Sequence, residues 1–344
     1  MNLQHRIDLL ARLGQYILSG NAEWTAIKEK AGYENGWFTP GFVDLATNNI
    51  ALSFLQKEKL QAWTATYPLE TSSPEGPGFR PLTIGIVMAG NIPLVGFHDF
   101  LSVFLSGHKA LIKPSSKDRV LINHIAEKLG EWDAEVNSRV AFSEMLKACD
   151  AYIATGSNNS SRYFDYYFKK YSHLIRRNRT SIGILTGEES MAELEKLADD
   201  VYTYFGLGCR NVTKIFVPRD YDFVPLLEAF RKYNYLAEHH KYKNNYDYNL
   251  ALHLLNKKYY MTNDSILLVE EAGVFSPISQ LNYEFYTGQQ ELNAKLPPQQ
   301  DLQCIAGKNF MPFGQALAPS LNDYADGVDT LRFLSSLQIK VENQ

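Results

Sequence analysis

The feature that most constrains the fold is a strand, a helix and a second strand in direct succession. Residues 82–88 form an apolar run that ends in a glycine turn, and residues 110–112 begin a second one. Between them, apolar residues recur at helical spacing from Leu94 to Leu105, and Gly107 supplies a helix stop. Strands joined in this way pair in parallel, and parallel sheets bind ligands at the carboxyl ends of their strands. The sequence therefore predicts an α/β protein with a parallel sheet.

A lone cysteine, Cys209, follows two glycines between an amphipathic helix and the strand-like run 212–217. Gly206 and Gly208 allow the backbone a sharp turn and a close approach to a ligand. A cysteine in such a turn can offer its sulfur as a nucleophile and its own N–H as an oxyanion donor, the two groups that acyl transfer needs. The alternative is a buried cysteine that acts as a small hydrophobic residue.

Other polar residues follow the ends of predicted strands. Asn91 follows the first strand, where its amide could meet a developing oxyanion or simply form a turn. Lys113 ends the second strand. It could pair with a phosphate, or it could simply be an exposed lysine at the end of a strand. Gly156 and Ser157 follow the run 151–155 and precede a helix, so their backbone N–H groups form a natural anion site.

Composition excludes several classes of function. The 344 residues are enough for two domains, and a net charge of −4 argues against general binding of nucleic acid or anionic membranes. Three scattered cysteines suit a reducing cytoplasm, and no clustered His and Cys residues predict a metal site. The sequence shows no apolar run of membrane-spanning length and no signal peptide. We therefore expect a cytoplasmic protein without a membrane span.

A basic and aromatic cluster includes Lys169, Lys170, Arg176, Arg177 and Arg179. Basic and aromatic side chains together can bind nucleic acid. The cluster is local and the whole chain is acidic, so the sequence favours a solvated helix face, with a phosphate-rich ligand such as a nucleotide or coenzyme A as a third interpretation.

The helix before Cys209 has a predicted start. Ser190 and Glu193 fit a capping box, in which the serine caps the helix and the glutamate lies three residues on. Glu188 and Glu189 are then most simply interpreted as acidic residues near a helix start.

Five motifs follow one another between residues 82 and 313: the turn 88–93, the strand end 111–115, the turn 154–157, the cysteine turn 206–209 and the segment 270–277. Together they resemble the aldehyde dehydrogenase superfamily and, more closely, its acyl-CoA reductase branch of LuxC type. The resemblance implies that Cys209 is the nucleophile and that the Asn91 amide lines the oxyanion hole. It also implies contacts with the cofactor. Lys113 and Ser115 would contact the adenosine ribose, and Gly156 and Ser157 would lie near the phosphates. Glu271 and Phe275 would contact the nicotinamide ribose.

Two departures from the superfamily pattern bear on the reaction. Members that oxidise aldehydes to acids carry a glutamate that activates water, and the comparable stretch 181–187 has none, although Glu188 and Glu189 come slightly later. A thioester on Cys209 would then hydrolyse slowly and persist for hydride or for a thiol such as coenzyme A. Ser116 stands where NAD-preferring members often have a glutamate that would repel the extra phosphate of NADP, which favours NADPH over NADH.

The turn-rich stretch 70–78 is interpreted as a linker. We expect an N-terminal helical cap over 1–80, a dinucleotide-binding domain over 81–185, a catalytic domain over 186–315 and a C-terminal segment, 316–344, that packs back on the core. The chain is short for the superfamily and lacks a recognisable oligomerisation hairpin, so a homo-oligomer is one possibility among others.

The resemblance implies that the protein reduces an acyl thioester such as a fatty acyl-CoA to an aldehyde with NADPH, and that coenzyme A is the leaving group. An aldehyde-oxidising or acyl-phosphate-reducing relative is the alternative among enzymes. A non-catalytic nucleotide-binding or assembly protein is the alternative from another class.

Overall fold

The computed structural model describes residues 1–69 and 80–341, so the linker predicted at 70–78 lies outside the described residues. The chain divides into two units: Met1–Asn178 with Ser320–Gln344, and Arg179–Pro319. The domain boundaries expected after residues 80, 185 and 315 stay predictions. Across the described ranges, no helix combines the length and the apolar character needed to cross a membrane.

The first unit is built on a five-stranded parallel sheet in the order β3-β2-β1-β4-β5. Its strands are β1 (Thr83–Val87), β2 (Lys109–Lys113), β3 (Val140–Phe142), β4 (Ala151–Thr155) and β5 (Ser172–Arg176). Its helices are α1 (Leu3–Leu18), α2 (Ala22–Glu34), α3 (Pro40–Ser53), α4 (Lys57–Thr64), α5 (Phe97–Ser106), α6 (Val120–Trp132), α7 (Asn158–Phe168) and α12 (Thr330–Val341), with short 3-10 helices at Ala134–Ser138 and Ala325–Gly327. The predicted succession of strand, helix and strand is confirmed, because α5 joins β1 to the parallel strand β2 and Gly107 ends α5 at φ 82°.

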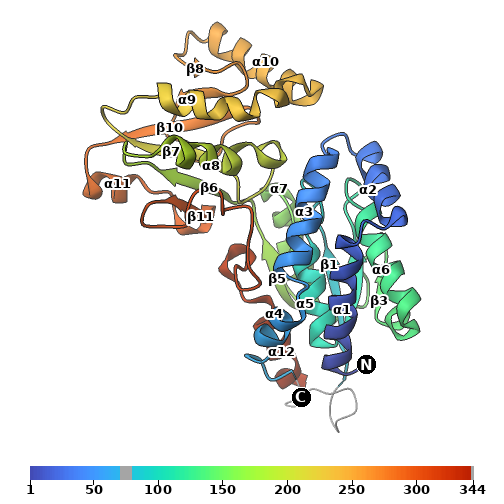
Figure 1. The fold of residues 1–344 in the computed structure, drawn as a ribbon. Helices are drawn as coiled ribbons and strands as arrows, with labels where there is room; N and C mark the ends of the chain where they lie inside the picture. The colour runs from blue at the N-terminus through green and yellow to red at the C-terminus, as the bar shows by residue number, and fades with distance from the viewer. Residues whose placement is uncertain (70–79, 342–344) are drawn as a thin grey trace. The chain divides into compact units, whose positions relative to one another are not determined.

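Helices cover both faces of this sheet. Ile84, Ile86 and Ile153 share one core with α5, whereas Tyr152 points to the other face because side chains alternate along a strand. The ring of Tyr152 stacks on Phe168 of α7 with 4.1 Å between ring centroids. Helices α5 and α7 therefore lie on opposite faces. On the α5 side, α1 packs against α3, α5 and α6 (Figure 1).

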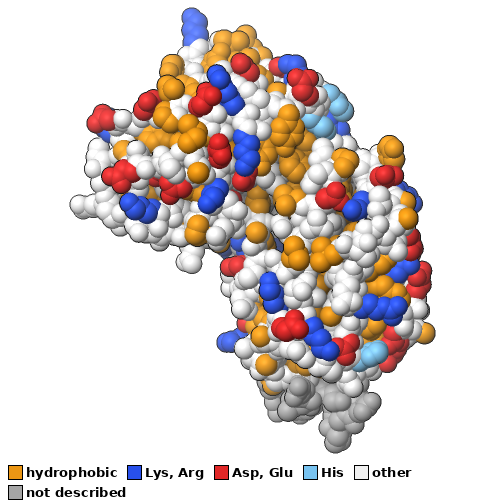
Figure 2. Space-filling model, viewed as in Figure 1, with side chains coloured by type: hydrophobic (Ala, Val, Ile, Leu, Met, Phe, Trp, Pro, Cys, Tyr) orange, Lys and Arg blue, Asp and Glu red, His pale blue; other side chains and the backbone are white. Residues whose placement is uncertain are grey.

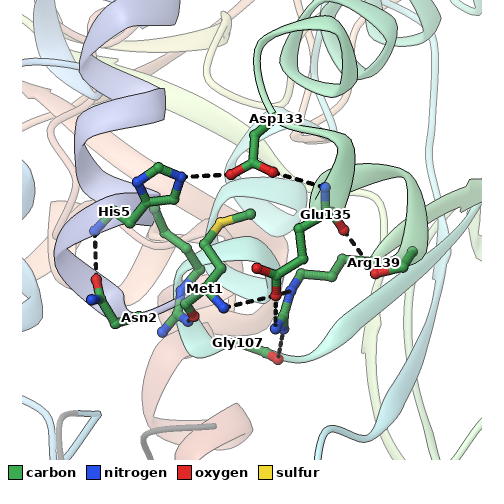
Figure 3. Close-up of polar contacts among 9 residues, drawn as sticks. Met1, Asn2, His5, Gly107, Asp133, Glu135 and Arg139 are labelled. Carbon is green, nitrogen blue, oxygen red and sulfur yellow. Dashed lines mark hydrogen bonds and ion pairs between the residues drawn. The ribbon is translucent and has the colours of Figure 1, made fainter. Parts of the chain in front are cut away.

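Polar contacts also join the N-terminal helix to the segment after α6 (Figure 3). The α-amino group of Met1 lies 2.7 Å from a Glu135 carboxylate oxygen, which also accepts from the Arg139 guanidinium at 2.6 Å. His5 of α1 lies 2.6 Å from Asp133. Surface ion pairs contribute at most about 1 kcal/mol each, so apolar packing of α1 carries most of the attachment. Acidic and basic side chains are interspersed over the face drawn in Figure 2.

Arg176 is buried at the end of β5, so the prediction of a solvated helix face for the basic cluster is wrong at this residue. Its guanidinium donates to Asp99 of α5 and to Thr330 of α12, each over 2.7 Å, and to the Ala325 carbonyl over 2.6 Å. The side chains of Arg176 and Asp99 are only 3% and 8% exposed. One guanidinium therefore joins β5 to α5 by an ion pair and to the C-terminal segment by hydrogen bonds.

Replacing Arg176 by alanine would leave the Asp99 carboxylate buried without its partner. We expect the free energy of unfolding of the first unit to fall by about 3–5 kcal/mol. Arg177→Ala is the matched control, because Arg177 is 63% exposed and its pair with Asp165 should be worth at most about 1 kcal/mol. All 4 tryptophans lie in the first unit, so urea unfolding followed by tryptophan fluorescence reports on that unit. Equal losses in the two variants would contradict this role of Arg176.

The second unit contains a six-stranded sheet in the order β11-β6-β7-β10-β9-β8, in which only β8 and β9 pair antiparallel. Its strands are β6 (Thr180–Ile184), β7 (Val212–Pro218), β8 (Met261–Thr262), β9 (Leu267–Glu270), β10 (Gln280–Tyr286) and β11 (Leu302–Gly307). Its helices are α8 (Met191–Tyr202), α9 (Val224–Phe230), α10 (His240–Leu255) and α11 (Gln289–Lys295), with 3-10 helices at Thr203–Gly206, Arg231–Glu238 and Gln299–Asp301. The predicted capping box of Ser190 and Glu193 is confirmed at the start of α8.

Helices cover both faces of the second sheet as well. Gly183 of β6 faces α8, since a Cβ at this position would lie in ordinary contact, 3.5 Å from a methyl carbon of Leu197. Its neighbours Ile182 and Ile184 point to the other face, where they form a cluster with Leu292 of α11. Strand β7 therefore lies at the centre of a sheet that is buried on two sides.

Candidate active site

The carboxyl ends of β1 and β4 form the topological switch point of the first sheet. The chain leaves β1 for β2 and leaves β4 for β5 in opposite directions, with α5 and α7 on opposite faces. Open parallel sheets bind their ligands at such a point. The turn after β1 holds Asn91, and Gly156 and Ser157 follow β4, so three predicted site residues follow two adjacent strands.

The turns after β1 and β2 pack directly against each other. The Met88 N–H donates to the Lys113 carbonyl over 3.0 Å. Gly90 lies so close to Ser115 that a Cβ at residue 90 would be 2.6 Å from the serine Cβ and Oγ. The turn that carries Asn91 and the strand end that carries Lys113 and Ser115 thus form one structural element. Lys113 is exposed and Ser115 half-buried, so both side chains are accessible to a ligand.

Gly156 and Ser157 connect β4 to α7. The Ser157 hydroxyl caps α7 by accepting from the Ser160 N–H over 3.2 Å. A Cβ at residue 156 would lie 2.9 Å from atoms of Ser160 and Phe164, so this position requires glycine. The Gly156 N–H donates to the Arg176 carbonyl over 3.3 Å and is thereby used in strand pairing. An anion at this turn would therefore contact Ser157 and the N–H groups that follow it.

In the second unit, Cys209 lies in a strained turn between α8 and β7. Tyr204, Phe205 and Gly206 have consecutive positive φ angles of 55°, 57° and 73°. Each of the two aromatic residues costs about 1 kcal/mol or more in this left-handed region. Burial offsets the cost, because Tyr204 and Phe205 are 5% and 1% exposed. The three left-handed residues reverse the direction of the chain just before Cys209.

Asn211, which sequence reasoning missed, organises the cysteine turn. Its side chain is fully buried, and its Nδ2 donates to the carbonyls of Asp200 and Thr203 at the end of α8, over 2.9 Å each. Its Oδ1 accepts from the Gly208 N–H over 2.8 Å. One side chain thus satisfies carbonyls that the helix end leaves unpaired and fixes the residue before Cys209. In the sequence, nothing distinguishes this residue from an ordinary turn asparagine.

The Asp200 carboxylate extends this arrangement to a second segment. It accepts from the Gly314 N–H over 2.7 Å and from the Ala316 N–H over 3.1 Å. Burial raises the pKa of Asp200 to about 7, although these two hydrogen bonds oppose the shift. The last turn of α8 therefore holds both the cysteine turn and residues 314–316.

The thiols differ in their surroundings. Cys209 and Cys304 are half-buried, whereas Cys149 is buried in the first unit, where burial raises the pKa of its thiol. The Ser181 hydroxyl on β6 donates to the Cys209 carbonyl over 3.3 Å and lies 3.0 Å from the Cys304 sulfur. Ser181 thus links the cysteine turn to β6 and β11.

Glu188 and Glu189 lie at the opposite end of the second sheet from Cys209. They follow the carboxyl end of β6, whereas Cys209 precedes the amino end of the parallel strand β7. A strand such as β6 spans about 16 Å. The Glu189 carboxylate accepts from the N–H groups of Thr186 and Gly187, over 2.6 and 3.0 Å. Neither glutamate is therefore placed to act as a base at Cys209.

A pocket of the second unit lies at this same end, away from Cys209. It has a volume of about 760 Å³ and is lined by Glu189 and Arg219 among other residues at the carboxyl ends of β6, β7 and β10. Within residues 1–69 and 80–341, no group of three His, Cys, Asp or Glu side chains could hold a metal ion.

The segment with Glu271 and Phe275 lies beside the first residues of β7. The Thr213 hydroxyl donates to the Val274 carbonyl over 2.7 Å, and the buried Lys214 ammonium donates to the Ala272 carbonyl over 2.7 Å. Thr213 and Lys214 come soon after Cys209 in the chain. The structure thus brings this segment close to the start of the strand that follows the cysteine turn.

Two comparisons by sequence bear on identity. A family model described as acyl-CoA reductase (LuxC) matches residues 56–228, which is half of the chain. The matched region includes Asn91, Lys113 and Cys209 and ends before Glu271 and Phe275. The chain matches no curated protein sequence.

Solved aldehyde dehydrogenases have a similar fold. The NAD-dependent enzyme of Sinorhizobium meliloti aligns with a TM-score of 0.65 and 11% identity over 92% of this chain and 73% of that chain. Aldehyde dehydrogenase 21 of Physcomitrella patens, in complex with succinate, aligns with a TM-score of 0.68 and 10% identity over 98% and 85%. Aldehyde dehydrogenase C of Pseudomonas syringae, in complex with NAD+ and octanal, aligns with 0.65 and 12% over 90% and 73%. The expected aldehyde dehydrogenase fold is confirmed.

Asn211→Ala would leave the Gly208 N–H and the carbonyls at the end of α8 without their partner. We expect the local opening free energy of the cysteine turn to fall by about 2–4 kcal/mol, measured as faster amide exchange by mass spectrometry over residues 200–212. Asn211→Asp should cause at least as much loss, because a carboxylate cannot donate to the carbonyls. Asn256→Ala is the control, since Asn256 donates to the Leu252 carbonyl from an exposed position. Unchanged exchange in Asn211→Asp would contradict this role.

Proposed function

Because this chain belongs to the acyl-CoA reductase (LuxC) family and has the aldehyde dehydrogenase fold, we propose that it reduces an acyl thioester, such as a fatty acyl-CoA, to an aldehyde with NADPH. The observation that carries the proposal is the position of Cys209. Its thiol is half-buried, and its strained turn is held by the buried Asn211. A nucleophile must be both accessible and fixed in orientation, and this turn supports both requirements.

In the proposed reaction, the Cys209 thiolate attacks the carbonyl carbon of the acyl thioester and forms a carbon–sulfur bond. The π electrons of the carbonyl move onto its oxygen, where the Cys209 N–H and the Asn91 amide would stabilise the negative charge. When the oxyanion collapses, the bond to the coenzyme A sulfur breaks and coenzyme A leaves as a thiolate. The acyl group remains as a thioester on Cys209. Asn91 belongs to the first unit and Cys209 to the second, so the role of Asn91 stays a prediction.

The residues at the switch point of the first sheet fit a dinucleotide. Gly90 and Gly156 let the two turns pack closely, because a Cβ would clash with Ser115 at the first position and with Ser160 and Phe164 at the second. Lys113 and Ser115 would contact the adenosine ribose, and Ser157 would lie near the phosphates at the start of α7. When bound, NADPH would supply the hydride that reduces the thioester carbon.

Glu271 and Phe275 would contact the nicotinamide ribose. The Lys258 ammonium lies 2.5 Å from the Glu271 carboxylate, and this hydrogen bond lowers the pKa of Glu271. The carboxylate is therefore ionised at neutral pH and can accept hydrogen bonds from ribose hydroxyls. Phe275 is 40% exposed, so its ring is accessible to a ligand.

The acyl-enzyme must survive hydrolysis long enough to be reduced. Glu188 and Glu189 lie at the other end of the second sheet and cannot activate a water at Cys209. This arrangement favours reduction of an acyl thioester over hydrolysis to a free acid.

Cys209→Ala removes the nucleophile, so we expect no acyl adduct at this position and at least about a thousandfold loss of acyl-CoA reduction. The measurement is intact-protein and peptide mass spectrometry after brief mixing with a medium-chain acyl-CoA, before and after addition of NADPH. Cys149→Ala is the control and should keep both the adduct and its discharge by NADPH. An active Cys209→Ala protein would overturn the proposal. An adduct formed only with acyl phosphates would favour the acyl-phosphate-reducing alternative.

Ser116→Glu tests the cofactor preference. A carboxylate at this exposed position after β2 would repel the extra phosphate of NADPH. We expect the affinity for NADPH to fall about tenfold relative to that for NADH, measured by equilibrium binding from nucleotide fluorescence. Ser116→Gln has a similar size without the charge and should leave the ratio of affinities unchanged. An unchanged ratio in Ser116→Glu would show that residue 116 does not face the phosphate.

A further inference from the structure

Asp118 is a buried carboxyl group beside the turn that carries Asn91. It follows β2 and is only 7% exposed. Its Oδ2 accepts from the Leu94 N–H over 2.6 Å, while its Oδ1 has no hydrogen-bond partner among the residues that the structure describes. Burying a carboxyl group with one oxygen left unpaired costs free energy, so its presence here calls for an explanation. No step of the proposed mechanism uses it.

Leu94 needs a fixed partner because its backbone is strained. Its φ is 54°, in the left-handed region that a leucine rarely adopts. Its side chain is 4% exposed, and its carbonyl accepts from the Phe97 N–H over 2.9 Å at the start of α5. Leu94 therefore ends the turn that contains Asn91 and begins the approach to α5. Its remaining backbone group, the N–H, is held by Asp118.

Asp118 contacts this turn on both sides of Asn91. Gly90, just before Asn91, packs against it, because a Cβ at residue 90 would lie 3.2 Å from the Asp118 Cβ. Leu94, three residues after Asn91, donates to its carboxyl group. Asp118 is itself fixed, because its N–H donates to the Ser115 carbonyl over 3.1 Å.

The surroundings of Asp118 determine its charge. Burial raises the pKa of Asp118 from 3.8 to about 8, and the Leu94 N–H opposes this shift. Lys113, Lys117 and Arg119 on the same loop are exposed, so solvent screens their charges, and residues 88–96 on the facing turn include no charged side chain. Burial therefore favours the protonated carboxyl group at pH 7, and its closest neutral analogue is asparagine.

We propose that Asp118 is a positioning residue, which holds the turn between β1 and α5 so that the Asn91 amide keeps one orientation toward the acyl oxygen. This inference rests on the proposed function, because Asn91 is an oxyanion donor only in that reaction. Asp118 itself does not touch the substrate. It acts through Gly90 and Leu94, the residues on either side of the Asn91 segment.

Asp118→Ala removes the acceptor for the strained turn, and Asp118→Asn keeps it. We expect Asp118→Ala to lower kcat for acyl-CoA reduction by about tenfold to 100-fold with little change in KM, because a misplaced donor weakens only the transition state. Asp118→Asn should stay within about twofold of the parent at pH 7. The control is Asp150→Ala, since Asp150 accepts from the Thr83 N–H over 2.7 Å at the other end of β1, and it should not change kcat.

The pH dependence gives a readout that a purely structural role would not produce. In the parent protein, kcat should decline as pH rises through about 8, because ionised Asp118 is unfavourable in its buried position. The contribution of Asp118 to the free energy of unfolding also decreases as pH rises. The native carboxyl group holds a proton between pH 3.8 and about 8 that the unfolded chain releases, so its contribution is full below pH 3.8 and is lost by about pH 8. Asp118→Asn cannot titrate and should show neither change.

The outcomes separate the two levels of the proposal. A parent protein that forms no acyl adduct on Cys209 overturns the proposed function and, with it, the role of Asp118. An active parent with a fully active Asp118→Ala variant overturns the positioning role alone. The positioning role is supported if Asp118→Ala loses activity while Asp118→Asn keeps it, and if kcat of Asp118→Asn does not decline as pH rises through about 8.

Discussion

Backbone groups at the ends of strands and helices must find hydrogen-bond partners that regular structure does not supply. In each of the two turns that carry predicted catalytic residues, one buried side chain supplies such a partner. Asn211 holds the cysteine turn after α8, and Asp118 holds the turn after β1. Each of these turns also contains at least one left-handed residue that is not glycine, Leu94 in one and Tyr204 and Phe205 in the other. Strain in a turn persists only where surrounding contacts determine the backbone, and these two side chains are central to those contacts. The reactive groups of the proposed mechanism lie within the two turns.

The sequence predicted the parts of the fold that have a local signal. The first strand–helix–strand unit, the left-handed stop at Gly107 and the capping box at Ser190 depend on neighbours within a few residues, and all are present. Strand β5 was missed because its five residues include His173 and end on Arg176. Arg176 can be buried only because Asp99, far earlier in the chain, pairs with it. Periodicity contains no information about such a partner.

The candidate site shows the same contrast between features with a local sequence signal and features that depend on residues far apart in the chain. The positions of Cys209 and Asn91 after glycine-rich turns could be predicted from spacing, whereas the residues that hold these turns could not. Only the parallel pairing of β6 and β7 shows that Glu188 and Glu189 lie far from Cys209, although they are close to it in the chain. The sequence left open whether either glutamate takes part in catalysis, and the sheet topology places both away from Cys209. The roles of individual site residues remain predictions.

The first unit is discontinuous in sequence, and this has a consequence for synthesis on the ribosome. Leu331 and Leu334 of α12 belong to the core of residues 1–178, and Thr330 binds the guanidinium of Arg176. These groups are translated only after the whole second unit, which is continuous and can fold as its last strand emerges. The nascent first unit must therefore wait with an apolar groove beside α5 and an incompletely bound arginine. Its exposure to aggregation and to chaperones is set by the time needed to translate the insertion.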